Sequence, residues 1–193
     1  MKKLNFLLAL IAISTAGFSQ AIWTIDNVHS KIGFNVTHMA VAEVEGKFND
    51  FAGTVVTKGS DFDGAEVSFS AKTASIDTDN EKRDGHLKSP DFFDAAKYPE
   101  VTFKGNLVKS GTKYALKGNL TMHGVTKAVE FEVTGGSTVD TGRGVKSGFK
   151  FTSSINRKDY GLTWSHSTPT GELVVSENVE LIVKVELDKD KKV

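Results

Sequence analysis

The sequence of 193 residues contains no cysteine. A chain without thiols has no disulfide framework, no cysteine nucleophile and no cysteine ligand for a metal. It also has no excess of charge of either sign, because 24 basic residues are balanced by 24 acidic ones. An overall basic character that would attract nucleic acid or anionic membrane is therefore missing, and we expect no nucleic-acid partner.

Long apolar runs are also missing, with one exception at the N-terminus. Lys2 and Lys3 precede an apolar run over 4–13, and small residues follow near 19–21. This order is typical of a secretory signal peptide, and the run is too short to span a bilayer. We expect residues 1–21 to be a cleaved signal peptide and residues 22–193 to form one periplasmic or secreted domain. No transmembrane segment is expected in that domain.

The mature sequence is dominated by alternation of apolar and polar residues with a period of two. In the segment 31–37, for example, Ile32, Phe34 and Val36 alternate with polar neighbours. Similar segments recur near 66–72, 100–107, 113–122, 129–134 and 179–187. This period is typical of strands that bury one face and expose the other to water. The pattern predicts an all-β fold.

Turn signals separate these segments. Ser110-Gly111 and His123-Gly124 indicate tight hairpins, whereas Gly135-Gly136-Ser137 is predicted to open a longer loop that ends near residues 142–144. Strands joined by short turns favour an antiparallel sheet. About eight such strands can close into a barrel, which removes the exposed edges.

One charged and aromatic stretch, 80–103, interrupts the alternation. Thr78 and Glu81 have capping-box spacing, which predicts a short helix over 81–88, and Ser89-Pro90 predicts a second helical turn. The insert is longer than a hairpin requires. Two compatible interpretations remain open: a lid or binding loop, or a plug that packs Leu87, Phe92 and Phe93 over one end of the barrel.

Two glycines occupy apolar positions of their strands. Gly105 and Gly118 stand where a filled core would have a side chain. They indicate either space for an internal cavity or a bend in a curved strand, and the sequence leaves both open.

Candidate chemistry is sparse. The five histidines form no zinc-protease motif, and no Gly-x-Ser-x-Gly nucleophile motif is present. We therefore predict no catalytic residue, no metal site and no cofactor. His38 continues an apolar strand face and is expected to point inward. Arg83, Asp84 and His86 are either a solvated helix face or the polar edge of a binding site beside the aromatic insert.

Several blocks of the chain resemble the YceI-like family. They read WTIDNVHSKIGF (23–34), EGKFNDFAG (45–53), SIDTDNEKRDGHLKSPDFFD (75–94), GNLTMHGVTK (118–127) and INRKDYGL (155–162). The resemblance extends from about Trp23 to Leu187. It implies a lipocalin-like antiparallel β-barrel with a short helical insert, which binds a polyisoprenoid such as a quinone or a polyprenyl chain. Homodimers are known in that family.

Carried onto this chain, the resemblance implies three groups of site residues. The inward positions that would contact the lipid tail are Phe34, Val36, Phe69, Val101, Phe103, Leu116, Leu120, Phe131, Phe149, Phe151, Leu181 and Val183. Leu87, Phe92 and Phe93 would cap or gate the barrel. His38, Arg83, Asp84 and His86 would lie at the rim, near a polar head group.

Three functions are compatible with these residues. The first, favoured by the resemblance, is carriage or storage of a long-chain isoprenoid lipid without a chemical step. The second is an enzyme for a lipid or amide-like substrate, with His38, His86 and Asp84 as acid and base, which requires those side chains to converge. The third is an exported structural or stress protein whose barrel is filled by its own side chains.

Overall fold

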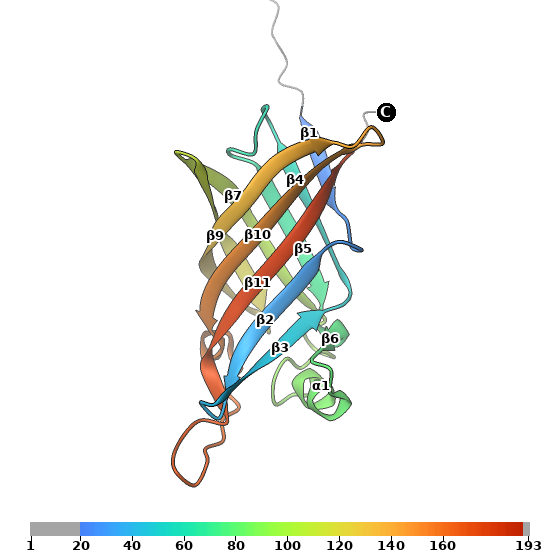
Figure 1. Ribbon diagram of the computed structural model, residues 1–193. Coiled ribbons are helices and arrows are strands. Elements are labelled where there is room, and N and C mark those ends of the chain that lie inside the picture. The colour runs from blue at the N-terminus through green and yellow to red at the C-terminus, as the bar shows by residue number, and fades with distance from the viewer. Residues whose placement is uncertain (1–19, 191–193) are drawn as a thin grey trace, which may run out of the picture.

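The computed structural model describes residues 20–190 and shows a closed antiparallel β-barrel (Figure 1). The predicted signal peptide lies almost entirely outside the described residues. The strands are β1 (Ala21–Ile25), β2 (Lys31–His38), β3 (Ala42–Phe48), β4 (Phe51–Thr57), β5 (Glu66–Lys72), β6 (Ile76–Asp77), β7 (Glu100–Ser110), β8 (Lys113–Met122), β9 (Val125–Asp140), β10 (Val145–Asn156) and β11 (Val175–Lys189). The predicted all-β barrel is confirmed.

The strand segments combine into eight positions around the barrel. β1 and β2 both pair with β11, through Ile25 opposite Leu187 and Lys31 opposite Lys184, so they are two halves of one interrupted strand. β4 pairs with β1 and β3 pairs with β2, which makes β3 and β4 the next interrupted strand. β6 continues β5 and pairs with β3. The chain thus runs up and down around the barrel, and the last strand closes on the first.

Both predicted hairpin turns are present, but the predicted loop does not begin at Gly135. Gly111 (φ 63°) joins β7 to β8, and His123 (φ 51°) with Gly124 (φ 75°) joins β8 to β9, as predicted. Gly135 (φ 104°) and Gly136 (φ 92°), however, do not open a loop, because β9 continues to Asp140. Their positive φ values instead accompany a shift in register against β10 between Ser147 and Phe149.

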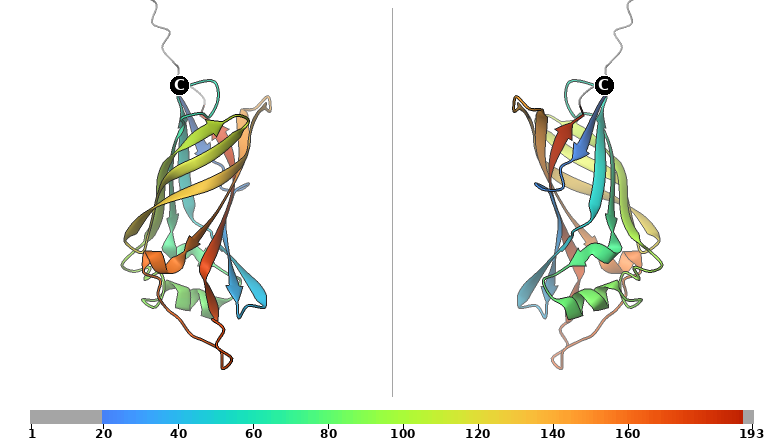
Figure 2. Two further views of the ribbon diagram at one scale, coloured as in Figure 1. Left: turned by 90° about the vertical axis from the view of Figure 1, so that its left-hand side faces the viewer. Right: turned by 90° about the vertical axis from the view of Figure 1, so that its right-hand side faces the viewer.

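The insert lies between β6 and β7 and crosses one end of the barrel, which we call the mouth (Figure 2). Helix α1 (Glu81–Lys88) begins where predicted, but its cap is Asn80, whose side chain accepts a hydrogen bond from Arg83 N at 3.0 Å. The predicted capping box is wrong because Asp79 turns the chain (φ 58°) between Thr78 and the helix. No helix in residues 20–190 is long and apolar enough to cross a membrane.

The segment after α1 turns without forming a second helix. Ser89 ends α1 in an extended conformation before Pro90, which disfavours helical geometry in the preceding residue. Backbone hydrogen bonds from Phe93 N to Leu87 O and from Ala95 N to Lys88 O fold this segment back on the helix. Ser89 Oγ accepts a hydrogen bond from Asp91 N at 3.3 Å and Ser89 O accepts one from Phe92 N at 3.1 Å, so Ser89 caps a single turn at Pro90 as predicted. Further turns follow as far as residue 97.

The opposite end, which we call the base, is filled by aromatic side chains. Both ends of the described chain lie there (Figure 1). The ring of Phe62, in the β4–β5 connection, packs 5.0 Å from Trp23 and 4.8 Å from Phe149, and Phe149 stacks on Phe151 at 5.6 Å. Trp23, Phe62 and Phe149 are all buried. This packing seals the base from within.

Gly105 and Gly118 face each other across β7 and β8 and make room for an aromatic ring. A Cβ at Gly118 would lie 2.6 Å from Cζ of Phe103, and one at Gly105 would lie 2.8 Å from the same atom. The space above both glycines is therefore occupied by Phe103 and by close approach of the strands. Of the two interpretations left open, the glycines serve local packing of the wall and do not themselves line a cavity.

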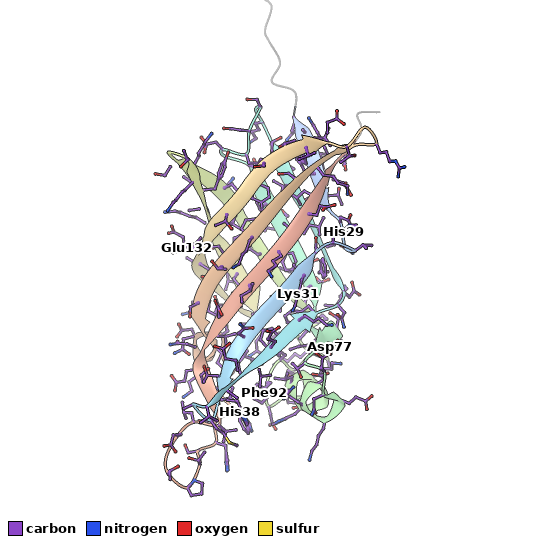
Figure 3. The ribbon with its side chains drawn as sticks, viewed as in Figure 1. His29, Lys31, His38, Asp77, Phe92 and Glu132 are labelled. Carbon is purple, nitrogen blue, oxygen red and sulfur yellow. The ribbon has the colours of Figure 1, made fainter. Side chains whose placement is uncertain are left out.

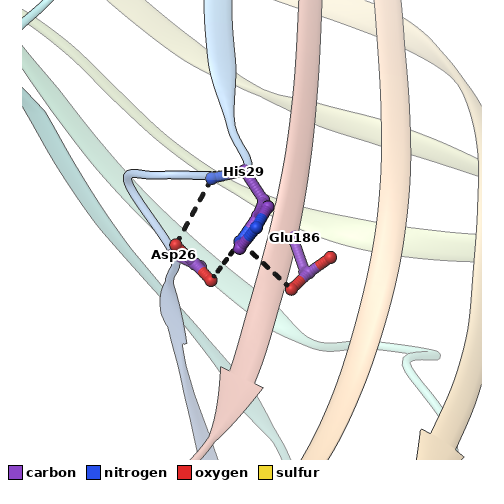
Figure 4. Close-up of side chains that lie close together, drawn as sticks. All are labelled: Asp26, His29 and Glu186. Carbon is purple, nitrogen blue, oxygen red and sulfur yellow. Dashed lines mark hydrogen bonds and ion pairs between the residues drawn. The ribbon is translucent and has the colours of Figure 1, made fainter.

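A cluster of charged side chains lies on the outer surface where the strand is interrupted between β1 and β2. His29 Nδ1 lies 2.8 Å from Asp26 Oδ2 and 3.7 Å from Glu186 Oε1 (Figure 4). Lys146 Nζ contacts Asp26 at 3.3 Å, Glu186 at 2.7 Å and Asp188 at 2.8 Å. The hydrogen bond with Asp26 raises the pKa of His29, and the same bond holds the pKa of Asp26 well below its usual range.

We expect Gly118→Ala to lower the free energy of unfolding by about 2 kcal/mol, because the added methyl overlaps Phe103 and the neighbouring backbone. Urea denaturation measures this change. Gly144→Ala is the matched control, since a Cβ there meets nothing within 4 Å and its φ is not in the left-handed region. Equal stability of the two variants would contradict the packing role of Gly118.

We expect His29→Gln to destabilise the protein in a pH-dependent way. The pKa of His29 is raised above its model-peptide value of 6.5, so its pairing stabilises fully below that pH and is lost as pH rises through the folded pKa. The deficit of the variant should thus be larger at about pH 5 than at about pH 9 in urea titrations. Val28→Thr, at an 85% exposed neighbour, should show no such dependence.

Candidate functional site

Within residues 20–190 the barrel contains a large cavity of about 560 Å³ that is partly open to solvent. This volume lies in the range of small-molecule binding sites, roughly 300–1,000 Å³. Its wall is formed by inward-facing side chains of the strands and is almost entirely apolar. The cavity extends to the mouth beneath α1, whereas Trp23, Phe62 and Phe149 at the base are not among the lining residues.

Most of the inward positions expected from the family resemblance line this cavity. Phe149 is the exception, because its ring is packed against Phe62 and Phe151 in the filled base. The positions that line the cavity are Phe34, Val36, Phe69, Val101, Phe103, Leu116, Leu120, Phe131, Phe151, Leu181 and Val183. Several of them, including Phe34 and Leu181, are only half-buried. Side chains around an internal space keep accessible surface although they point inward.

The cap residues bridge the mouth. Phe92 packs 5.2 Å from Trp164, and the ring of His86 lies nearly perpendicular to both, at 5.0 and 5.4 Å. Phe93 packs on the other side, 6.1 Å from Phe48 of β3. Leu87, Phe92 and Phe93 all line the cavity. The insert is therefore held between β3 and the 163–174 connection, directly over the cavity.

Figure 3 places His38 and Phe92 at the end that carries α1, whereas His29 lies farther toward the base on the outside. His38, Arg83 and His86 line the cavity, so His38 points inward as expected. Asp84 does not line it. The carboxylate of Asp84 accepts hydrogen bonds from Thr78 N at 2.9 Å and from Thr78 Oγ1 at 2.5 Å, which removes it from the predicted rim.

Among the lining residues that the sequence did not predict are Arg157 and Trp164. Arg157 follows β10 in the 3-10 turn η2 (Arg157–Tyr160) and is buried, although its sequence context reads as a charged loop. Trp164 lies in the connection before β11, where no alternation marks an inward face. The only available signal was that Arg157 belongs to the block INRKDYGL, which the family resemblance had already singled out.

Comparison with known proteins gives this barrel its family. The YceI-like domain matches residues 23–187. Protein YceI of Salmonella newport (strain SL254) is 35% identical over 192 residues, covering 96% of this chain and 97% of that protein. The chain belongs to the YceI-like family.

Solved structures agree with this assignment. The YceI protein of Campylobacter jejuni has a TM-score of 0.70 and 29% identity, and the match covers 80% of this chain and 90% of that chain. A polyisoprenoid binding domain from Saccharophagus degradans, implicated in plant cell wall breakdown, has a TM-score of 0.63 and 15% identity over 87% of this chain and 98% of that one. The second likeness shows the shared fold.

Within this YceI-like barrel, the residues of the enzyme hypothesis do not converge. Asp84 bonds to Thr78, and in residues 20–190 no hydrogen bond or ion pair joins it to His38 or His86. His86 Nε2 instead lies 3.0 Å from Asp91 Oδ2, and both of these side chains are exposed. Asp84 is therefore not joined to either histidine, as the hypothesis with these three residues required.

One cluster in residues 20–190 has donor atoms close enough for a metal ion. Donor atoms of Asp26, His29 and Glu186 lie within 4.8 Å of one another on the outer surface. Lys146 Nζ already pairs with both carboxylates of this group. An ammonium group thus supplies the positive charge there, and none of the three residues lines the cavity.

We expect Phe92→Ala to lower the free energy of unfolding by about 3 kcal/mol, because the side chain is 6% exposed and packs against both His86 and Trp164. The emission of Trp164 should shift to longer wavelength as water reaches the indole. Val41→Ala is the control, since Val41 is 85% exposed and should change stability by less than about 0.5 kcal/mol. A Phe92→Ala variant as stable as this control would show that the cap does not contribute to folding.

Proposed function

We propose that this protein binds and carries a long-chain isoprenoid lipid, of quinone or polyprenyl type, inside the barrel and performs no chemical step on it. The observation that carries the proposal is the apolar cavity of about 560 Å³ in a YceI-like barrel. The shared fold with a polyisoprenoid binding domain supports the same class of ligand. In this proposal the eleven lining positions given above contact the tail.

The energetics of burial favour a long tail. One isoprene unit removed from water gains roughly 3–4 kcal/mol, at about 0.8 kcal/mol for each methylene. Binding costs on the order of 4–15 kcal/mol in lost freedom and ordering. One or two units therefore barely offset the cost, whereas a longer tail gives net affinity. The apolar wall selects for length of the tail.

The proposal includes the place of action. The basic start, short apolar run and small residues at positions 1–21 support export, so the protein would act in the periplasm or outside the cell. An exported carrier meets lipids in a compartment where free isoprenoids are insoluble. A closed barrel with an apolar interior suits that task.

The alternatives have less support. An enzyme would need His38, His86 and Asp84 around one pocket, and Asp84 is turned away to Thr78. A structural barrel filled by its own side chains would leave no large cavity, and residues 20–190 enclose one. Both observations favour carriage of a ligand.

The deciding experiment is mass spectrometry of the organic extract of mature protein purified gently from its native compartment. We expect a stoichiometric long-chain isoprenoid. Leu120→Arg should lose it, because the variant places a charge in the buried wall, while Asn119→Arg on the exposed face of the same strand should retain it.

A second variant guards against misfolding of Leu120→Arg. Leu181→Trp adds volume at a half-buried lining position without adding charge, so it should reduce the bound lipid while the thermal melt stays cooperative. A clean extract from folded wild-type protein never exposed to detergent would contradict the proposal. So would equal lipid content in all four proteins.

A further inference from the structure

The charges in the cavity wall are all of one sign. Lys82, Arg83 and Arg157 line the cavity together with His38 and His86, and the lining contains no aspartate and no glutamate. The whole chain, in contrast, has equal numbers of acidic and basic residues. The fully charged groups of the lining are therefore all basic, and the low-dielectric wall strengthens the interaction of each with a charged ligand.

Arg157 is the least solvated of these cations. It is 3% exposed, and its guanidinium donates to the carbonyl oxygens of Ser176 at 2.9 Å, Leu162 at 2.5 Å and Val175 at 3.4 Å. Within residues 20–190 no carboxylate lies within 4.0 Å of it. Carbonyl dipoles satisfy its hydrogens but do not neutralise its charge, so a buried cation remains without a counter-ion.

The carboxylate of Glu177, which lies near Arg157, is bonded to other residues. Glu177 bonds to Lys158 Nζ at 2.5 Å and accepts from Asn156 Nδ2 at 3.4 Å. Burial lowers the pKa of Arg157, and the charge of Glu177 opposes this effect only from a distance. The guanidinium is thus held by backbone carbonyls in a residue that lines the cavity, and its charge is not paired with a carboxylate in residues 20–190.

Arg83 of α1 is exposed, and its guanidinium is also bonded to neutral oxygens. Its Nε donates to Thr78 Oγ1 at 2.7 Å and its Nη2 donates to Thr78 O at 2.6 Å, which fixes the guanidinium at the cavity edge. Asp84, the acid next to it in sequence, is bonded to Thr78 and forms no ion pair with Arg83 in the described chain. Lys82 adds a further exposed cation on α1.

We infer that the barrel selects amphiphiles whose polar head is an anion, a phosphate or a carboxylate, held at the mouth by Lys82 and Arg83 and facing the buried charge of Arg157. This inference rests on the proposed function and specifies its ligand. Guanidinium groups match the geometry of phosphate and carboxylate oxygens, and charge-assisted bonds strengthen where water is excluded. A neutral head of the same size gains neither effect.

The test compares three ligands that share one geranylgeranyl tail and end in a phosphate, a carboxylate or an alcohol. Binding to the wild-type protein is followed by quenching of Trp164, which lines the cavity. We expect both anions to bind at least about tenfold more tightly than the alcohol at low salt. The preference should weaken as ionic strength rises, since part of the site is exposed.

Variants identify the groups responsible. Lys82→Gln combined with Arg83→Gln should lower the affinity for the phosphate more than that for the alcohol, so that their ratio approaches one. Lys88→Gln removes a charge from the same helix at a position outside the lining and should leave the ratio unchanged. Arg157→Gln should also lower the ratio, and where it fails to fold, the double variant decides alone.

The outcomes separate this inference from the function on which it rests. Equal affinity for the three ligands, or tighter binding of the alcohol, would overturn the anionic head group and leave lipid carriage intact. Absence of binding for all three, the alcohol included, would instead overturn the proposed function. An unchanged ratio in the double variant would remove Lys82 and Arg83 from the site.

Discussion

Closure of the sheet by β11 is the interaction on which the rest of the structure depends. This strand pairs with β10 on one side and, on the other, with β2 near the mouth and β1 near the base. Without that second set of pairings, the sheet would have two open edges and no enclosed space. The charged cluster of Asp26, His29 and Lys146 sits where the partner strand is interrupted, and it ties that interruption to Glu186 of β11.

Closure alone does not create a cavity, because a barrel of eight strands is narrow enough for side chains to fill. Here the filling is uneven along the axis. Phe62, Trp23 and Phe149 occupy the base, whereas the middle and the mouth are lined by side chains that leave about 560 Å³ between them. Gly105 and Gly118 contribute indirectly, since they let the ring of Phe103 lie against the wall. The cavity therefore results from the positions of the large side chains along the barrel axis.

The insert adds polarity to this apolar design. It spans the mouth through Phe92 and Phe93, and the same segment brings Lys82 and Arg83 to the cavity edge. Thr78 organises both charged neighbours, because it accepts from Arg83 and donates to Asp84. One threonine thus separates a cation that faces the cavity from an anion that does not. The site is amphiphilic, like the class of ligand proposed for it.

The sequence by itself determined the barrel and most of its inner face. The alternation of apolar and polar residues indicates which residues share a face of a strand, and the tight turns indicate which strands are neighbours. Phe34, Leu120 and Leu181 could therefore be predicted from the sequence to point inward. The features that do not follow the alternation of the strands were decided by the tertiary structure alone. That Phe149 fills the base, that Asp84 turns to Thr78 and that Arg157 is buried beside the cavity all depend on contacts between segments distant in the chain. Such contacts result from closure of the barrel and from packing between its segments. The local sequence pattern therefore does not predict them.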